Sequence, residues 1–172
     1  MAETGEIVNR VEKSGLVTIN LEEYYHPGER VIWDMADWLF QGLILREKDF
    51  RTGLKEVDWS EYDGKNVAIT CSADAIIPTW AYMLVATGLE GHAHLVVVGT
   101  LETLEYALFD QAVTAIDRDS FAGARVVVKG CGKLPVPDAA YVRLSMHLKP
   151  VVASLMFGEP CSTVPVYKRP KG

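Results

Sequence analysis

The sequence contains an internal repeat whose corresponding residues lie 59 positions apart. The segment VDWSEYDGKNVAITC begins at Val57, and IDRDSFAGARVVVKGC begins at Ile116. Eight positions are identical between residues 57–100 and 116–159: Asp58/Asp117, Gly64/Gly123, Val67/Val126, Pro78/Pro137, Ala81/Ala140, Tyr82/Tyr141, Leu89/Leu148 and Gly99/Gly158. A duplication explains the match, and the alternative is two unrelated βαβ segments with similar turns and strands. Both explanations favour a fold built from two similar βαβ segments.

Each copy has the residue pattern of a strand, a helix and a second strand. Short apolar runs at residues 67–70 and 126–129 are typical of parallel strands covered on both faces. Pro78 and Pro137 each precede a helix-forming segment, because the first turn of a helix tolerates a missing N–H. The second strands are expected at residues 95–98 and 154–157.

The predicted fold class is therefore α/β, a mostly parallel sheet covered by helices, with an N-terminal strand-rich segment. In that segment GLVTINLEEY, RVIWDM and DWLFQGLIL are expected to form strands that pair partly antiparallel. A length of 172 residues suits a single domain over residues 1–172, with repeat halves at about 45–100 and 104–159.

Charge and hydropathy argue against several functional classes. The formal net charge of −6 argues against nucleic-acid binding, which needs a basic surface. The longest apolar run, residues 75–89, contains Pro78 and is too short to span a membrane. The first residues, MAETGEIVNRVEKSG, lack the apolar core of a signal peptide. We therefore expect a cytoplasmic protein whose three cysteines stay reduced.

Each of the three cysteines follows a predicted strand, and together they form the main candidate site. Cys71 directly follows the first strand, Cys131 follows the second after one glycine, and Cys161 follows the last after GEP. Since parallel strands end at the same edge of a sheet, we expect the thiols to gather at the carboxyl edge, where α/β sheets bind ligands. Three thiolates suit zinc or iron, including an iron–sulfur cluster. Asp74 is the candidate fourth ligand, although it is also a candidate helix N-cap.

Two other interpretations of the cysteines stay open, so the sequence does not decide whether the protein is an enzyme. Cys131 lies between Lys129 and Lys133 and precedes a helix, which favours a reactive thiolate acting as a nucleophile or persulfide carrier. Alternatively, the cysteines only pack in the core of a non-catalytic interaction protein, because free cysteine is among the most buried residue types.

The chain resembles a bacterial family described as domain of unknown function 2480. The resemblance rests on KNVAITCSADAIIPTWAYML, VVVKGC and GEPCSTVPVYK, and extends over nearly the whole length. It supplies no catalytic residues, because the family carries no established activity. The resemblance implies that the gene lies near genes for iron–sulfur cluster assembly. It therefore implies an accessory role in that assembly, with iron–sulfur assembly proteins as partners. A homo-oligomer stays open. Cys71, Cys131 and Cys161 are the positions that the matching motifs carry over.

Overall fold

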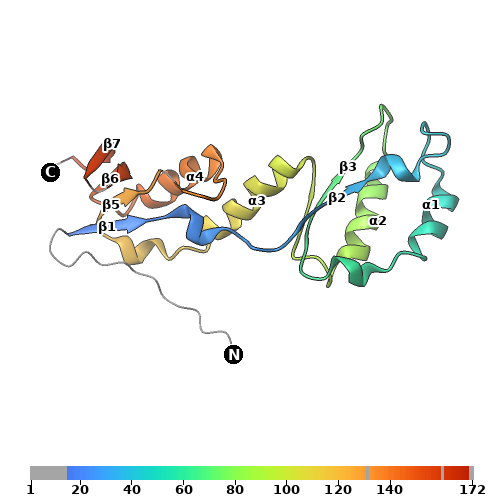
Figure 1. Cartoon of the computed structure of the whole chain (residues 1–172), viewed down its shortest axis with the longest axis horizontal. Helices are drawn as coiled ribbons and strands as arrows, with labels where there is room; N and C mark the ends of the chain where they lie inside the picture. Colours follow the sequence, from blue (N-terminus) through green and yellow to red (C-terminus); the bar gives the residue numbers. More distant parts are fainter. Residues whose placement is uncertain (1–14, 131, 160, 171–172) are drawn as a thin grey trace. The chain divides into compact units, whose positions relative to one another are not determined.

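The computed structural model describes residues 15–130, 132–159 and 161–170 (Figure 1). The contacts divide the chain into two compact units. Unit 2 comprises residues 26–108, and unit 1 comprises residues 1–25 and 109–172. Unit 2 is thus inserted within the sequence of unit 1, and each unit is described by itself.

Unit 2 is built on a three-stranded parallel sheet with the order β2-β3-β4. Its strands are β2 (Arg30–Asp34), β3 (Asn66–Thr70) and β4 (Leu95–Val98). Its helices are α1 (Glu47–Leu54), α2 (Thr79–Leu89), the first residues of α3 (Leu101–Thr114), and the 3₁₀ helices η2 (Met35–Trp38) and η3 (Trp59–Tyr62). The central strand β3 has four of its five residues buried, as expected for a parallel strand covered on both faces.

Unit 1 is built on a four-stranded sheet with the order β1-β5-β6-β7. Its strands are β1 (Leu16–Ile19), β5 (Arg125–Val128), β6 (Ser154–Glu159) and β7 (Ser162–Lys168). Strands β1, β5 and β6 are parallel, and β7 returns antiparallel to β6. The unit also contains the later residues of α3, helix α4 (Asp138–Leu148), and the 3₁₀ helices η1 (Leu21–Tyr24) and η4 (Arg118–Phe121).

The two units repeat the same structure with the offset that the sequence predicts. Helices α2 and α4 begin and end 59 residues apart, and so do η3 and η4. In the sheets Asn66 pairs with Leu95, and Arg125 pairs with Ser154, so both central strands have the same register. The loop bond from Gly64 N–H to His92 O recurs from Gly123 N–H to Val151 O. An internal βαβ duplication accounts for this correspondence.

The repeat also includes the first strand of each unit, which the sequence comparison missed. Leu16 pairs with Arg125 where Arg30 pairs with Asn66, so β1 and β2 correspond with an offset of 14 residues. Each strand is followed by a 3₁₀ helix whose N-cap side chain, Asn20 or Asp34, accepts a backbone N–H. A capped 3₁₀ turn of four residues is too short to be recognised from residue identities alone.

The cores confirm the same equivalence. Phe50 and Phe109 lie 59 residues apart and are 1% and 2% exposed. The buried residues of α2 and α4 occupy equivalent positions: Ala81, Val85 and Leu89, and Ala140, Leu144 and Leu148. Each unit therefore has its own hydrophobic core, which forms from the same positions of the repeat.

The α/β fold class is confirmed, and two finer expectations are wrong. The segment DWLFQGLIL does not form a strand, since it contains part of η2, a turn with Gln41 at φ 52°, and one bridge between Phe40 and Ile44. The N-terminal strands pair parallel with their neighbours, β1 with β5 and β2 with β3. The antiparallel strand is β7 near the C-terminus, which pairs with β6. The single-domain organisation stays a prediction.

Candidate functional site

A cavity of about 620 Å³ lies at the carboxyl edge of the unit 1 sheet. Strand β1 leads into its walls through Asn20 and Glu22, and β5 through Lys129 and Gly130. Asp138, the first residue of α4, also lines it. The carboxyl ends of parallel strands and the amino-terminal end of a helix therefore meet around one cavity, which is the usual ligand position in α/β sheets.

Glu22 fixes the loop that follows β5. Its carboxylate accepts a hydrogen bond from Leu134 N–H. The same carboxylate packs against Gly132, where any side chain would overlap it. Glu22 thus holds the backbone of a loop that is joined to β5 and α4. A charged group that organises a loop at this edge is typical of a binding site.

Lys129 and Glu159 connect the ends of strands β5 and β6. The two strands are adjacent, with Val128 paired to Phe157. Lys129 Nζ lies 4.0 Å from Glu159 Oε2, and their side chains are 36% and 47% exposed. An exposed pair of this kind contributes about 0–1 kcal/mol to stability. Its importance is positional, because each residue precedes a cysteine by two positions.

The cysteines belong to different parts of the molecule. Cys161 is exposed and free, next to Ser162, which pairs with Glu159 in the β6–β7 hairpin. Cys131 lies outside the described residues, although its chain neighbours Gly130 and Gly132 both line the cavity. Cys71 is half-buried in unit 2, and its Sγ donates to Ala73 O at 3.4 Å.

The strands preceding the cysteines do not form the single sheet that the sequence suggested. Cys71 follows β3 of the three-stranded sheet, whereas Cys131 and Cys161 follow β5 and β6 of the four-stranded sheet. The expectation of a shared carboxyl edge therefore applies only to Cys131 and Cys161. Asp74 is exposed and is not a helix N-cap, since Pro78 occupies that position for α2. Among residues 15–130, 132–159 and 161–170, no three His, Cys, Asp or Glu side chains are close enough to hold a metal.

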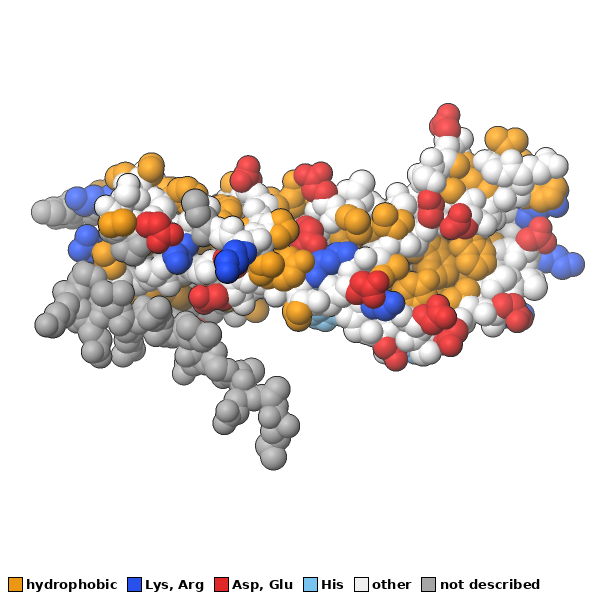
Figure 2. All heavy atoms as spheres, viewed as in Figure 1, with side chains coloured by type: hydrophobic (Ala, Val, Ile, Leu, Met, Phe, Trp, Pro, Cys, Tyr) orange, Lys and Arg blue, Asp and Glu red, His pale blue; other side chains and the backbone are white. Residues whose placement is uncertain are grey.

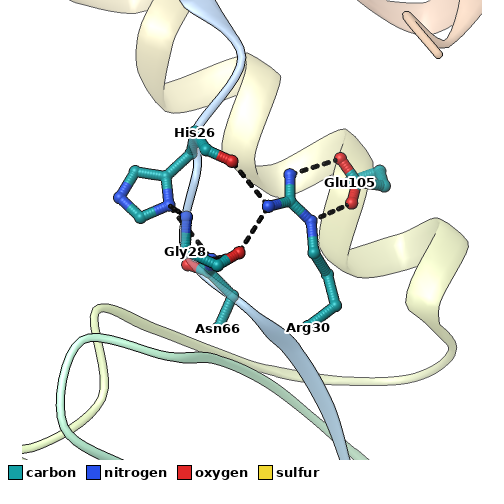
Figure 3. A network of polar contacts seen from close by, with 5 residues as sticks. All are labelled: His26, Gly28, Arg30, Asn66 and Glu105. Atoms are coloured by element: carbon teal, nitrogen blue, oxygen red, sulfur yellow. Dashed lines mark hydrogen bonds and ion pairs between the residues drawn. The ribbon is translucent and has the colours of Figure 1, made fainter. Parts of the chain in front are cut away.

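A second polar cluster lies at the opposite, amino edge of the unit 2 sheet (Figure 3). The Arg30 guanidinium forms an ion pair with Glu105 and donates to His26 O and Gly28 O, each at 2.5 Å. Asn66 is fully buried, and its Nδ2 lies 3.0 Å from both His26 Nδ1 and Gly28 O. These bonds tie the strand starts to α3, so the cluster has a structural role.

The surroundings of His26 in this cluster favour its neutral form. Its Nδ1 accepts from Gly28 N–H at 3.1 Å, and its ring stacks on His94 with centroids 3.8 Å apart. Burial lowers the pKa of His26, and the nearby His94 and Arg30 lower it further. Protonation at Nδ1 would remove the acceptor that Gly28 and Asn66 use.

Comparison with known proteins confirms the family that the sequence resembles. Residues 5–169 match the family described as Protein of unknown function (DUF2480). The chain belongs to the DUF2480 family. No curated protein and no solved structure is significantly similar to it. In the part of this DUF2480 protein that the structure describes, every helix is too short or too polar to cross a bilayer.

Proposed function

We propose that the protein binds a soft metal ion, zinc or iron, or an iron–sulfur cluster, through Cys131 and Cys161 of unit 1. The carrying observation is the Lys129–Glu159 ion pair, which joins the ends of two adjacent strands just before the two cysteines. Thiolates are the ligands that zinc, iron and iron–sulfur clusters prefer. An accessory role in iron–sulfur cluster assembly is consistent with such a site.

The remaining ligands come from another residue of this edge, a partner protein or water. Cys71 and Asp74, the other members of the predicted four-residue site, belong to unit 2, and Cys71 already has a hydrogen-bond acceptor there. Their participation stays a prediction. A two-thiolate site with open positions suits transfer of an ion or cluster better than permanent storage, because transfer needs an exchangeable ligand position.

Metal content per chain tests the proposal. Protein purified without a His-tag or chelator is analysed for zinc and iron by mass spectrometry. The single variants C131S and C161S are each expected to lose most of the bound metal, to a similar degree. The matched control C71S is expected to retain it. Equal loss in all three variants would favour the original three-cysteine site, and metal-free wild-type protein would reject the proposal.

A reactive thiol at Cys131 is the second candidate function. The cavity of unit 1 favours this function, because it is lined by Lys129, Gly130 and Gly132, which flank Cys131 in the sequence. A nearby lysine and a helix amino terminus stabilise a thiolate. If this function holds, Cys131 is alkylated faster than Cys161 and Cys71 at neutral pH in metal-free protein, and mass spectrometry of the tryptic peptides measures the three rates.

A further inference from the structure

Unit 2 contains a cleft of about 540 Å³ that combines acidic and aromatic side chains and lies beside strand β2. Its acidic residues are Asp34, Asp37, Glu56, Asp58 and Glu61, and its aromatic residues are Trp33, Trp38 and Tyr62. No Lys, Arg or His is among the described residues that line it. Figure 2 shows hydrophobic side chains gathered on one face of this unit, with acidic side chains around them.

The internal repeat shows that the fold does not need most of these side chains, although Asp37 and Asp58 correspond to the acidic residues Glu23 and Asp117 of unit 1. The positions equivalent to Asp34, Glu56 and Glu61 are occupied in unit 1 by Asn20, Ala115 and Ser120. Likewise, Ile19, Tyr24 and Phe121 replace Trp33, Trp38 and Tyr62. Since unit 1 forms the same strands and 3₁₀ helices without them, the extra carboxylates and indoles of unit 2 require another explanation.

Within the described part of the chain, three of the five carboxylates have no compensating partner. Asp34 and Asp58 cap η2 and η3, and hydrogen bonds from Ser72 and Ser60 respectively lower their pKa values, which keeps them ionised. The carboxylates of Asp37, Glu56 and Glu61 form neither a hydrogen bond nor an ion pair with the residues that the structure describes. Adjacent uncompensated charges repel one another unless a cation joins them.

The aromatic wall contains an unsatisfied donor. Trp33 is 5% exposed and stacks on Trp38 and Trp59, with ring centroids 5.4 and 5.2 Å away. Its Nε1 has no acceptor within the described part of the chain. A buried N–H of this kind normally has a partner, so its neighbourhood calls for an acceptor such as a carbonyl oxygen.

Unit 2 as a whole attracts cations. Residues 26–108 contain thirteen Asp or Glu and six Lys or Arg, a net charge of −7, whereas the rest of the chain carries +1. The acidic character of the protein therefore comes from unit 2. A field of this sign steers basic ligands toward the unit.

We propose that the acidic–aromatic cleft binds a basic peptide segment of a partner protein. Lysine or arginine head groups meet Asp37, Glu56 and Glu61, and their methylene stems lie against the aromatic rings. This site is independent of the cysteines of unit 1.

Tryptophan fluorescence of the full chain provides the test, because all four tryptophans lie in unit 2. The probe is the peptide GKGKG with acetylated and amidated ends, which has no tryptophan of its own. Wild-type protein is expected to show a saturable change. E56A/E61S, which copies the residues of unit 1, is expected to weaken binding about tenfold through loss of two charges.

The matched control is E29A/E90S, which removes two charges from the same unit outside the cleft and is expected to change affinity less than about twofold. W38Y, the unit 1 residue at that position, provides a second cleft variant should E56A/E61S fold poorly, and it is expected to weaken binding several-fold. Absence of saturable binding, equal loss in the control, or equally tight binding of GQGQG, Ca²⁺ or spermidine would overturn the proposal.

Discussion

At the residue scale, His26 couples the amino edge of unit 2 to pH. Its folded-state pKa is lowered, so the unfolded chain binds a proton on this residue more readily than the folded chain does. The stabilising contribution of neutral His26 is complete above the ordinary histidine pKa of about 6.5, and it decreases as the pH falls below that value toward the lowered folded pKa.

We therefore expect the free energy of unfolding to decrease between pH 7 and pH 5 in the wild-type protein. H26N is expected to reduce this decrease, because an asparagine oxygen can still accept from Gly28 N–H but does not titrate. Urea denaturation between pH 7 and pH 5 measures the free energy of unfolding of the wild-type protein and of H26N. An unchanged dependence of the unfolding free energy on pH in H26N would contradict the assignment.

Glu22 is the residue on which the loop after β5 most depends. Glu22→Ala removes the acceptor of Leu134 N–H, a loss of about 1–3 kcal/mol of local stability. Hydrogen exchange at the Leu134 amide should therefore accelerate by about tenfold, while the strand amides of β5 stay protected. The control E23A changes the neighbouring residue of the same 3₁₀ helix, and equal acceleration in both variants would show that Glu22 has no special role.

At the element scale, helix α2 approaches η3 closely at Gly88. Gly88 lies where any side chain would overlap the Trp59 ring. Gly88 is the penultimate residue of α2, and the absence of a side chain there leaves room for the Trp59 indole. Unit 1 has His147 and Arg118 at these positions, which shows that this contact belongs to unit 2 alone.

Gly88→Ala should consequently destabilise the protein, although alanine favours a helix by about 0.5–1 kcal/mol over glycine. Overpacking against a rigid indole costs about 1–3 kcal/mol and exceeds that gain. Thermal denaturation would show a lower midpoint. The control T87A, on the exposed side of the same helix, should have little effect, and a raised midpoint in G88A would refute the packing argument.

The sequence predicted most elements but not their ends. Periodicity and the paired Pro78 and Pro137 located α2 and α4, and the β-branched runs located β3 and β5. The strand expected within DWLFQGLIL failed because apolar residues there pack around a turn, and composition does not distinguish the two. Strand β7 was missed because Pro165 breaks its pattern, which an edge strand tolerates.

At the scale of the whole molecule, the two units have separate cores built from equivalent residues. Phe50 and Phe109 provide matched probes, since both are nearly completely buried at the same repeat position. F50A and F109A should each cost about 3–5 kcal/mol. Hydrogen exchange measured by mass spectrometry should increase mainly at residues 26–108 in F50A and at residues 15–25 and 109–170 in F109A. Equal increases throughout both variants would instead support one cooperative domain.

The sequence by itself determined the repeat, and with it the α/β class, because a 59-residue periodicity of turns, strands and helices leaves few other folds. It also indicated that all three cysteines follow predicted strands. Only the tertiary structure decided that Cys71 follows a strand of another sheet, and that acidic and aromatic residues from β2, η2, η3 and the loop before η3 line one cleft. Strand order and the meeting of distant loops depend on hydrogen bonding and packing between segments, which local residue patterns do not encode.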